Sequence, residues 1–176
     1  MSETGNGSEI RVESRHLTVE HISVHSVIPY AIARRRLESR LGRLHDGIRK
    51  LLAENQIDQV RRELQDAAGS DGLAIHYIGL HGDWLALEGG RSNCTNYLIG
   101  NVLYAVQMTK VDLASGLYAP LRVVLYEDAE GGSTFEYDRP STLFGQFGKA
   151  GIDDIARVLD EKLLTLLRGV LDPSVQ

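Results

Sequence analysis

Residues 152–170 read IDDIARVLDEKLLTLLRGV, and apolar side chains recur through this stretch every three or four positions. That period places one continuous apolar face along a helix, formed by Ile152, Ile155, Ala156, Leu159, Leu163, Leu166, Leu167 and Val170. Asp153 and Asp154 fall in the first turn, where carboxylates stabilise the helix dipole. The stretch therefore predicts a long amphipathic helix whose apolar face packs against another layer.

A second stripe with helical spacing precedes it and is formed by Tyr30, Ala33, Leu37, Leu41, Leu44, Ile48 and Leu51 or Leu52. Helical spacing resumes at residues 57–68, so two helices in tandem and one long kinked helix are both possible. Strands are expected at residues 15–25, 73–80, 84–87, 95–99, 121–126 and 133–138, and a short helix at 102–111. The polar turn at 127–132 predicts that the last two strands form a hairpin.

This order of elements predicts an α+β fold, in which long amphipathic helices pack on a single antiparallel sheet. The sequence has no internal repeat and no long interior linker. We therefore expect one domain at residues 15–171, between a disordered polar leader (1–14) and a short tail (172–176).

The composition excludes several classes of protein. The net charge of -5 over 176 residues disfavours general nucleic-acid binding, which needs a basic surface. The single cysteine, Cys94, allows no internal disulfide and no thiolate metal cluster, and suits a reducing compartment. No apolar run approaches the roughly 20 residues of a membrane span. We expect a cytoplasmic protein with neither a nucleic-acid nor a membrane partner.

Three segments carry a family resemblance: residues 97–101 read YLIGN, residues 117–128 read LYAPLRVVLYED, and residues 137–141 read YDRPS. Together they resemble the bacterial domain-of-unknown-function 302 family. The resemblance implies a TBP-like β-α-β4-α fold that is often dimeric and has no generally accepted activity. The sequence departs from the common family pattern at residues 80–84, where many members carry an Asp-His pair, and at Val102, where many carry proline.

His81 and Asp83 are the first candidates for chemistry. An imidazole and a carboxylate two residues apart at a strand end can carry a proton at neutral pH. A polar turn built by Gly82 and Asp83 explains the same residues without any function.

Four further candidates lie in the family-like segments. Asn101 can cap the following helix or face a ligand. Arg122, if it points inward, needs a partner such as Glu136, Asp138 or a ligand carboxylate. Tyr118 and Tyr137 can line a cavity or fill a core.

The histidines offer a weaker metal hypothesis. His21 and His25 share one face of the first expected strand, and His16 and His76 complete a possible imidazole group. No known metal-binding spacing accompanies them, so we expect neither metal nor cofactor. Cys94 has no His or Asp partner in the sequence that would make it a nucleophile.

These patterns favour a small-molecule-binding or interaction domain, and the family resemblance implies a homodimer. Its expected cleft lies between the long helix and the sheet, bordered by Tyr97, Asn101, Tyr118, Arg122 and Tyr137. One alternative is an enzyme that uses His81 or Asp83 in acid–base chemistry on a small carbonyl or carboxylate metabolite, so whether the protein is an enzyme stays open. A second alternative is a structural oligomerisation module.

Overall fold

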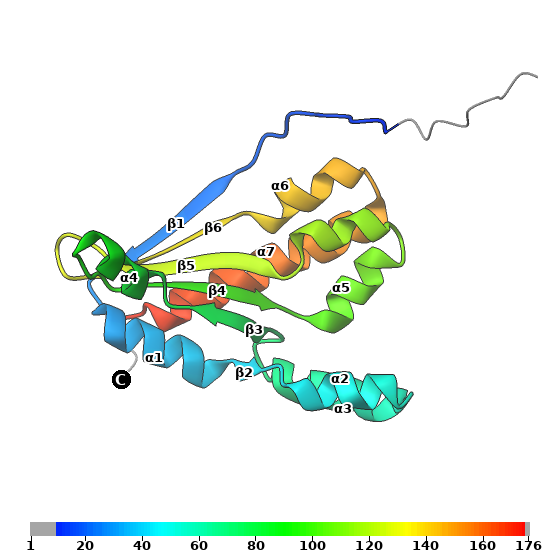
Figure 1. Cartoon of the computed structure of the whole chain (residues 1–176), viewed down its shortest axis with the longest axis horizontal. Helices are drawn as coiled ribbons and strands as arrows, with labels where there is room; N and C mark the ends of the chain where they lie inside the picture. Colours follow the sequence, from blue (N-terminus) through cyan, green and yellow to red (C-terminus); the bar gives the residue numbers. More distant parts are fainter. Residues whose placement is uncertain (1–9, 175–176) are drawn as a thin grey trace, which may run out of the picture.

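The computed structural model of the protein describes residues 10–174. Its centre is a six-stranded sheet in the order β1-β6-β5-β4-β3-β2 (Figure 1). The strands are β1 (His21–Ser26), β2 (Gly42–Arg43), β3 (Ala74–Gly79), β4 (Cys94–Gly100), β5 (Leu121–Glu127) and β6 (Ser133–Asp138). The predicted hairpin is confirmed as β5 and β6, which pair with Val123 opposite Tyr137.

The sheet is mixed, so the prediction of a purely antiparallel sheet is wrong at one edge. The short strand β2 runs parallel to β3, whereas all other neighbouring strands are antiparallel. Two helices, α2 (Asp46–Ala53) and α3 (Ile57–Ala68), connect β2 to β3. Parallel neighbours need such a crossover because a tight hairpin cannot return the chain in the same direction.

The stripe that begins at Tyr30 is therefore broken, and α1 (Tyr30–Arg40) ends before β2. A Cβ at Gly42 would lie 2.3 Å from the carbonyl oxygen of Ala67, so only glycine lets this strand approach α3 so closely. Ile48, Val60 and Leu64 form a small separate core between α2 and α3. These helices project from one corner of the molecule (Figure 1).

The remaining helices are α4 (His81–Trp84), α5 (Val102–Thr109), α6 (Pro140–Phe144) and the long α7 (Ala150–Val170), with 3-10 turns η1 (Leu85–Glu88), η2 (Leu113–Tyr118) and η3 (Gly145–Phe147). The predicted long amphipathic helix is confirmed as α7. The strand expected at residues 84–87 is wrong, because these residues continue α4 into η1. The first strand begins at His21 rather than residue 15, and residues 1–9 of the expected leader lie outside the described residues.

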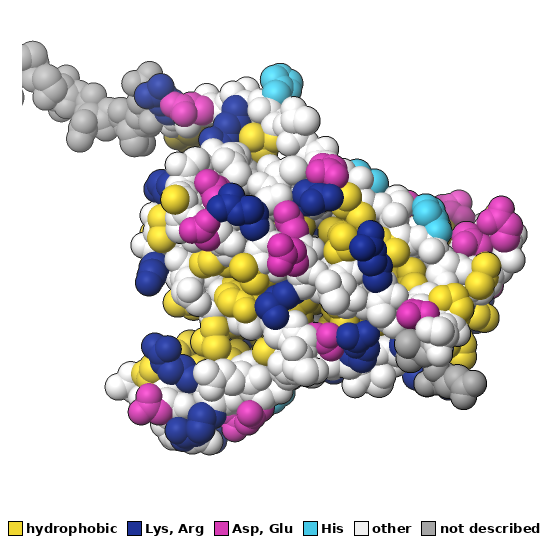
Figure 2. Space-filling view, turned by 180° about the vertical axis from the view of Figure 1, so that it is seen from behind, with side chains coloured by type: hydrophobic (Ala, Val, Ile, Leu, Met, Phe, Trp, Pro, Cys, Tyr) yellow, Lys and Arg dark blue, Asp and Glu magenta, His cyan; other side chains and the backbone are white. Residues whose placement is uncertain are grey.

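One face of the sheet packs against α7, which lies behind it in Figure 1, and against α1. Alternate side chains of each central strand enter this core, among them Tyr97, Ile99, Val123, Leu125 and Phe135. The apolar face of α7 meets them with Ile152, Ala156, Leu159, Leu163, Leu166, Leu167 and Val170, all of which are buried. From behind, acidic and basic side chains intermingle over the outer surface without a patch of one sign (Figure 2).

The opposite face of the sheet turns toward the viewer in Figure 1, and α7 does not cover it. The strand register places Leu98, Arg122 and Asp138 in one row across this face, next to a row with Asn96, Val124 and Glu136. Antiparallel sheets commonly leave one face accessible in this way. Among the described helices, none combines the length and apolar character that a membrane crossing needs.

Candidate functional site

The end of β4 and the start of β5 meet α5 at one end of the sheet. Asn101 caps the start of α5. Its side-chain oxygen accepts hydrogen bonds from the backbone N–H groups of Leu103 (2.8 Å) and Tyr104 (3.3 Å), and its side-chain nitrogen donates to the carbonyl of Gly72 (2.9 Å). This cap satisfies backbone donors that the first turn leaves without partners. Asn101 thus fixes the angle at which α5 leaves the sheet.

A pocket of about 230 Å³ opens beneath this junction. Its walls come from β3, β4, α5, the start of β5, α6 and α7, and its lining residues are His76, Gly100, Asn101, Val102, Ala105, Met108, Ala119, Pro120, Leu121, Phe144 and Leu159. The lining is mostly apolar, and His76 and Asn101 supply its polar side chains. An apolar concavity with few polar groups is the usual form of a small-molecule site.

His76 is placed at the pocket by an irregularity in β3. The register between β3 and β4 shifts between Ile75 and Tyr77, so His76 is the extra residue of a bulge. Within residues 10–174, its Nε2 is buried and has no hydrogen-bond partner. Burial lowers the pKa of His76, and the neighbouring backbone of Gly100 opposes this shift only in part. The imidazole is therefore held neutral, and a buried nitrogen without a partner costs about 1–3 kcal/mol.

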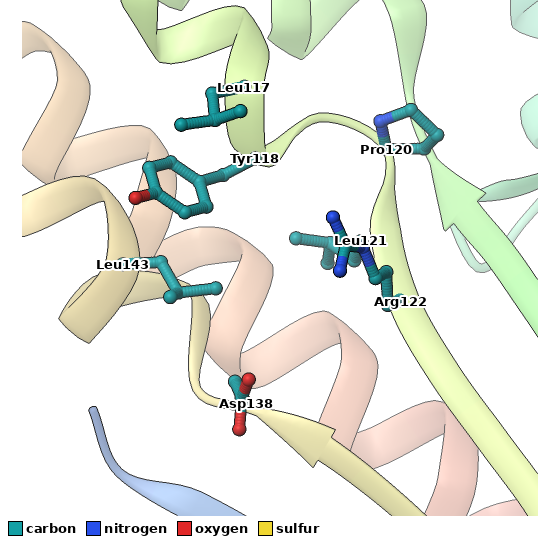
Figure 3. A pocket seen from close by; sticks show the side chains of 7 residues that line it. All are labelled: Leu117, Tyr118, Pro120, Leu121, Arg122, Asp138 and Leu143. Atoms are coloured by element: carbon teal, nitrogen blue, oxygen red, sulfur yellow. The ribbon is translucent and has the colours of Figure 1, made fainter.

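A second, smaller pocket of about 110 Å³ shares Pro120 and Leu121 with the first (Figure 3). Its other lining residues are Leu117, Tyr118, Arg122, Asp138 and Leu143. The Tyr118 ring is fixed by edge-on contacts with Phe144 and Phe147, at centroid distances of 5.9 and 6.3 Å. Arg122 is exposed and does not point into the core. The two pockets thus flank the chain where β5 begins.

Two of the tyrosines expected at the site lie elsewhere. Tyr97 is fully buried, and its hydroxyl donates to Glu38 Oε1 at 3.1 Å. Desolvation and the adjacent Glu38 carboxylate raise the pKa of Tyr97 well above its ordinary value. Tyr137 is 5% exposed and belongs to the main core. Neither residue lines the two pockets, which Asn101, Tyr118 and Arg122 do line.

His81 and Asp83 lie near the other end of β4. Both belong to the short helix α4, where His81 is exposed. Asp83 borders an open polar depression whose other charged side chains are Arg91, Glu127 and Asp128. Glu127 and Arg122 are five residues apart on one strand, roughly 17 Å. The structure therefore does not bring the His81–Asp83 pair together with Arg122.

The remaining histidines do not form a cluster with His76. His21 Nδ1 lies 2.9 Å from Asp138 Oδ1, and His25 Nδ1 lies 2.8 Å from Thr134 Oγ1. Over residues 10–174 there is no group of three or more His, Cys, Asp or Glu side chains arranged to hold a metal ion. Burial raises the pKa of the Cys94 thiol, which disfavours the reactive thiolate.

The sequence profile of the family described as "Domain of unknown function DUF302" matches residues 49–170. The chain belongs to this family. The matched segment includes every residue that lines the two pockets. The comparison with curated proteins gives no match.

One solved structure supports the fold. It is the crystal structure of an uncharacterized conserved DUF302 protein from Bacillus stearothermophilus, with a TM-score of 0.60 and 16% sequence identity. The alignment covers 86% of this chain and 98% of that chain. At this identity the likeness establishes a shared fold and carries no ligand or activity across.

Only part of the lining of the larger pocket is recognisable in the sequence. Asn101 and Pro120 lie in the family-like segments, but Met108, Phe144 and Leu159 carry no signal that separates them from ordinary core residues. His76 is visible in the sequence as one histidine in an apolar run. The bulge that turns it toward Gly100 depends on the pairing of β3 with β4.

Proposed function

We propose that this protein binds a small, largely apolar molecule in the 230 Å³ pocket between α5, α7 and the end of the sheet. The observation that carries the proposal is His76, which lines this mostly apolar pocket and whose buried Nε2 has no hydrogen-bond partner within residues 10–174. A ligand with a hydrogen-bonding group would supply that partner and place its apolar body against Met108 and Phe144.

The surrounding framework favours a preformed site. Met108 and Phe144 are almost fully buried, and Asn101 anchors α5 to the carbonyl of Gly72. A rigid wall lowers the entropic cost of binding because few side chains become ordered when the ligand enters. The neutral imidazole also avoids the cost of desolvating a charge beside an apolar ligand.

A fragment screen by ligand-observed NMR and native mass spectrometry tests the proposal, with two variants of one helix. Ala105 lines the pocket, whereas the adjacent Val106 is 55% exposed and does not. Ala105→Phe fills the pocket and should abolish binding of the fragments found, and Val106→Phe should retain it. Fragments that bind both variants equally, or a screen without any pocket binder, would refute the proposed function.

The open sheet face favours a second role, as the contact between two copies of the chain. Leu98 and Val124 lie on this face, and Tyr77 beside them is 56% exposed. We therefore propose a homodimer with the TBP-like topology that the family resemblance implies. We also propose a cytoplasmic location, which the single cysteine suits. Light scattering coupled to size-exclusion chromatography tests the dimer: a Leu98→Glu variant should elute as a monomer of about half the wild-type mass, and a monomeric wild type rejects the role.

The acid–base alternative has less support. It needs His81 or Asp83 beside a group that orients the substrate, and these residues lie on α4 at the far end of β4 from His76. Asp83 faces a depression lined by two further carboxylates, Glu127 and Asp128, which disfavours an anionic metabolite.

A further inference from the structure

Arg122 projects from β5 into the smaller pocket without a protein partner. Within residues 10–174, its guanidinium makes no hydrogen bond and no ion pair. The carboxylates nearest in the register are already engaged: Asp138 Oδ1 contacts His21 Nδ1 at 2.9 Å, and Glu136 Oε1 accepts a hydrogen bond from the Tyr126 hydroxyl at 2.8 Å. Arg122 therefore presents a planar set of donors that suits a carboxylate.

The two pockets are neighbours that share part of their linings. Pro120 and Leu121 form part of both linings, and Arg122 follows directly in the sequence. Pro120 directly precedes β5 and is two residues from Arg122, a separation of roughly 7 Å in extended chain. A molecule whose apolar body fills the larger pocket would have to extend past Pro120 to reach Arg122; both residues line the smaller pocket (Figure 3).

The walls of the smaller pocket select the charge of the ligand. Leu117, Tyr118 and Leu143 make most of its surface apolar, and Arg122 is its one basic side chain. Asp138 also lines it, and its negative charge is only partly offset by His21. A dianionic phosphate is disfavoured beside Asp138, whereas a single carboxylate matches one guanidinium.

We infer that the ligand is an amphipathic monocarboxylate, with its apolar body in the larger pocket and its carboxylate on Arg122. This inference rests on the proposed function and specifies the chemical class of its ligand. His76 lines the larger pocket and then contacts the body of the molecule.

The test compares octanoate with octanamide, which has the same chain and no charge, by isothermal titration calorimetry. Wild-type protein should bind octanoate about tenfold more tightly than octanamide. Arg122→Gln should remove this preference and leave the affinity for octanamide unchanged, while Arg122→Lys should retain part of it. Ala105→Phe should abolish binding of both compounds.

The outcomes distinguish a failure of the carboxylate inference from a failure of the proposed binding function. Equal binding of the two compounds to wild type, with loss in Ala105→Phe, overturns the carboxylate inference and leaves the pocket as a binding site. A uniform loss of both compounds in Arg122→Gln, at an unchanged melting temperature, also overturns it. Absence of binding by either compound overturns the carboxylate inference, and the fragment screen then decides separately whether the pocket binds any ligand.

Discussion

Gly100 lies directly against Pro120: a Cβ at position 100 would stand 3.2 Å from the Cβ of Pro120 and 3.4 Å from Nε2 of His76. The absence of a side chain at this position lets the imidazole and the residue before β5 lie this close to the end of β4. The same two neighbours, Gly100 and Pro120, line the larger pocket.

Gly100→Ala should therefore reduce ligand affinity with little effect on folding. The added methyl group occupies the space beside His76, and its contacts are close enough to need only a small adjustment. We expect the free energy of unfolding to change by less than about 1 kcal/mol, because alanine also restricts the unfolded chain. Chemical denaturation and calorimetry with pocket-binding fragments measure the two effects.

Gly82→Ala is the matched control for stability. A Cβ at Gly82 would lie 1.7 Å from the carbonyl oxygen of Ser92, so the backbone would have to move to make room for it. This variant should lose at least about 2 kcal/mol of unfolding free energy. Equal stability of the two glycine variants would show that the close approach at Gly82 is not needed for folding.

Tyr97→Phe should destabilise the protein because it removes the hydrogen bond to Glu38, which also pairs with Arg34 at 2.8 Å and Arg43 at 2.7 Å. Hydrogen bonds to charged groups contribute about 1.5–3 kcal/mol. Tyr126→Phe removes a more accessible bond to Glu136 and should cost less. Urea denaturation measures both variants, and an equal or larger loss for Tyr126→Phe would contradict the role assigned to Tyr97.

Leu163→Ala tests the packing of α7 on the sheet. Leu163 is fully buried in the main core, so this variant should lose about 2–5 kcal/mol of unfolding free energy. Val158 lies on the same helix and is 40% exposed, so Val158→Ala should lose less than about 1 kcal/mol. Similar losses at both positions in thermal denaturation would argue against the assigned face of α7.

His21 and His76 should titrate on opposite sides of the ordinary histidine value of 6.5. The hydrogen bond to Asp138 raises the pKa of His21 most, while burial lowers the pKa of His76. The stabilising effect of His21 is then complete below pH 6.5 and is lost as the pH rises through its folded-state pKa. The lowered pKa of His76 has the opposite effect on stability. As the pH drops below 6.5, the unfolded chain takes up a proton at His76 more readily than the folded protein does, so the free energy of unfolding falls.

Two-dimensional NMR titration of the imidazole carbon-bound protons measures both values. A His21→Gln variant should lose its stability difference from wild type as the pH increases above 6.5. A His21 value at or below 6.5 would contradict the contact with Asp138 across β1 and β6.

The fold was partly predictable because its strongest signals are local. The apolar period of α7 and the turn between β5 and β6 involve neighbours in the sequence, and both predictions are confirmed. The parallel pairing of β2 with β3 depends on how α2 and α3 return the chain to the sheet, which is a long-range arrangement. Leu41 and Leu44 continue the helical spacing of the preceding residues, so this spacing gives no sign of the strand between them.

The candidate site was also only partly predictable from the sequence. Asn101, Tyr118 and Arg122 are polar or aromatic residues in recognisable segments, and the structure places them at the two pockets. Tyr97 and Tyr137 have the same character, but the two-residue period of their strands directs them into the core. The sequence spacing alone does not say which face of the sheet the helices cover.

We propose that a ligand occupies the larger pocket and contacts His76. The most direct test of this proposal is NMR of protein labelled at the imidazole nitrogens and the methionine methyl groups, titrated with a pocket-binding fragment or octanoate. We expect the Nε2 resonance of His76 and the methyl resonance of Met108 to shift together, with one saturation curve, and Ala105→Phe to abolish both shifts. Binding that leaves these two resonances unmoved would contradict the proposal.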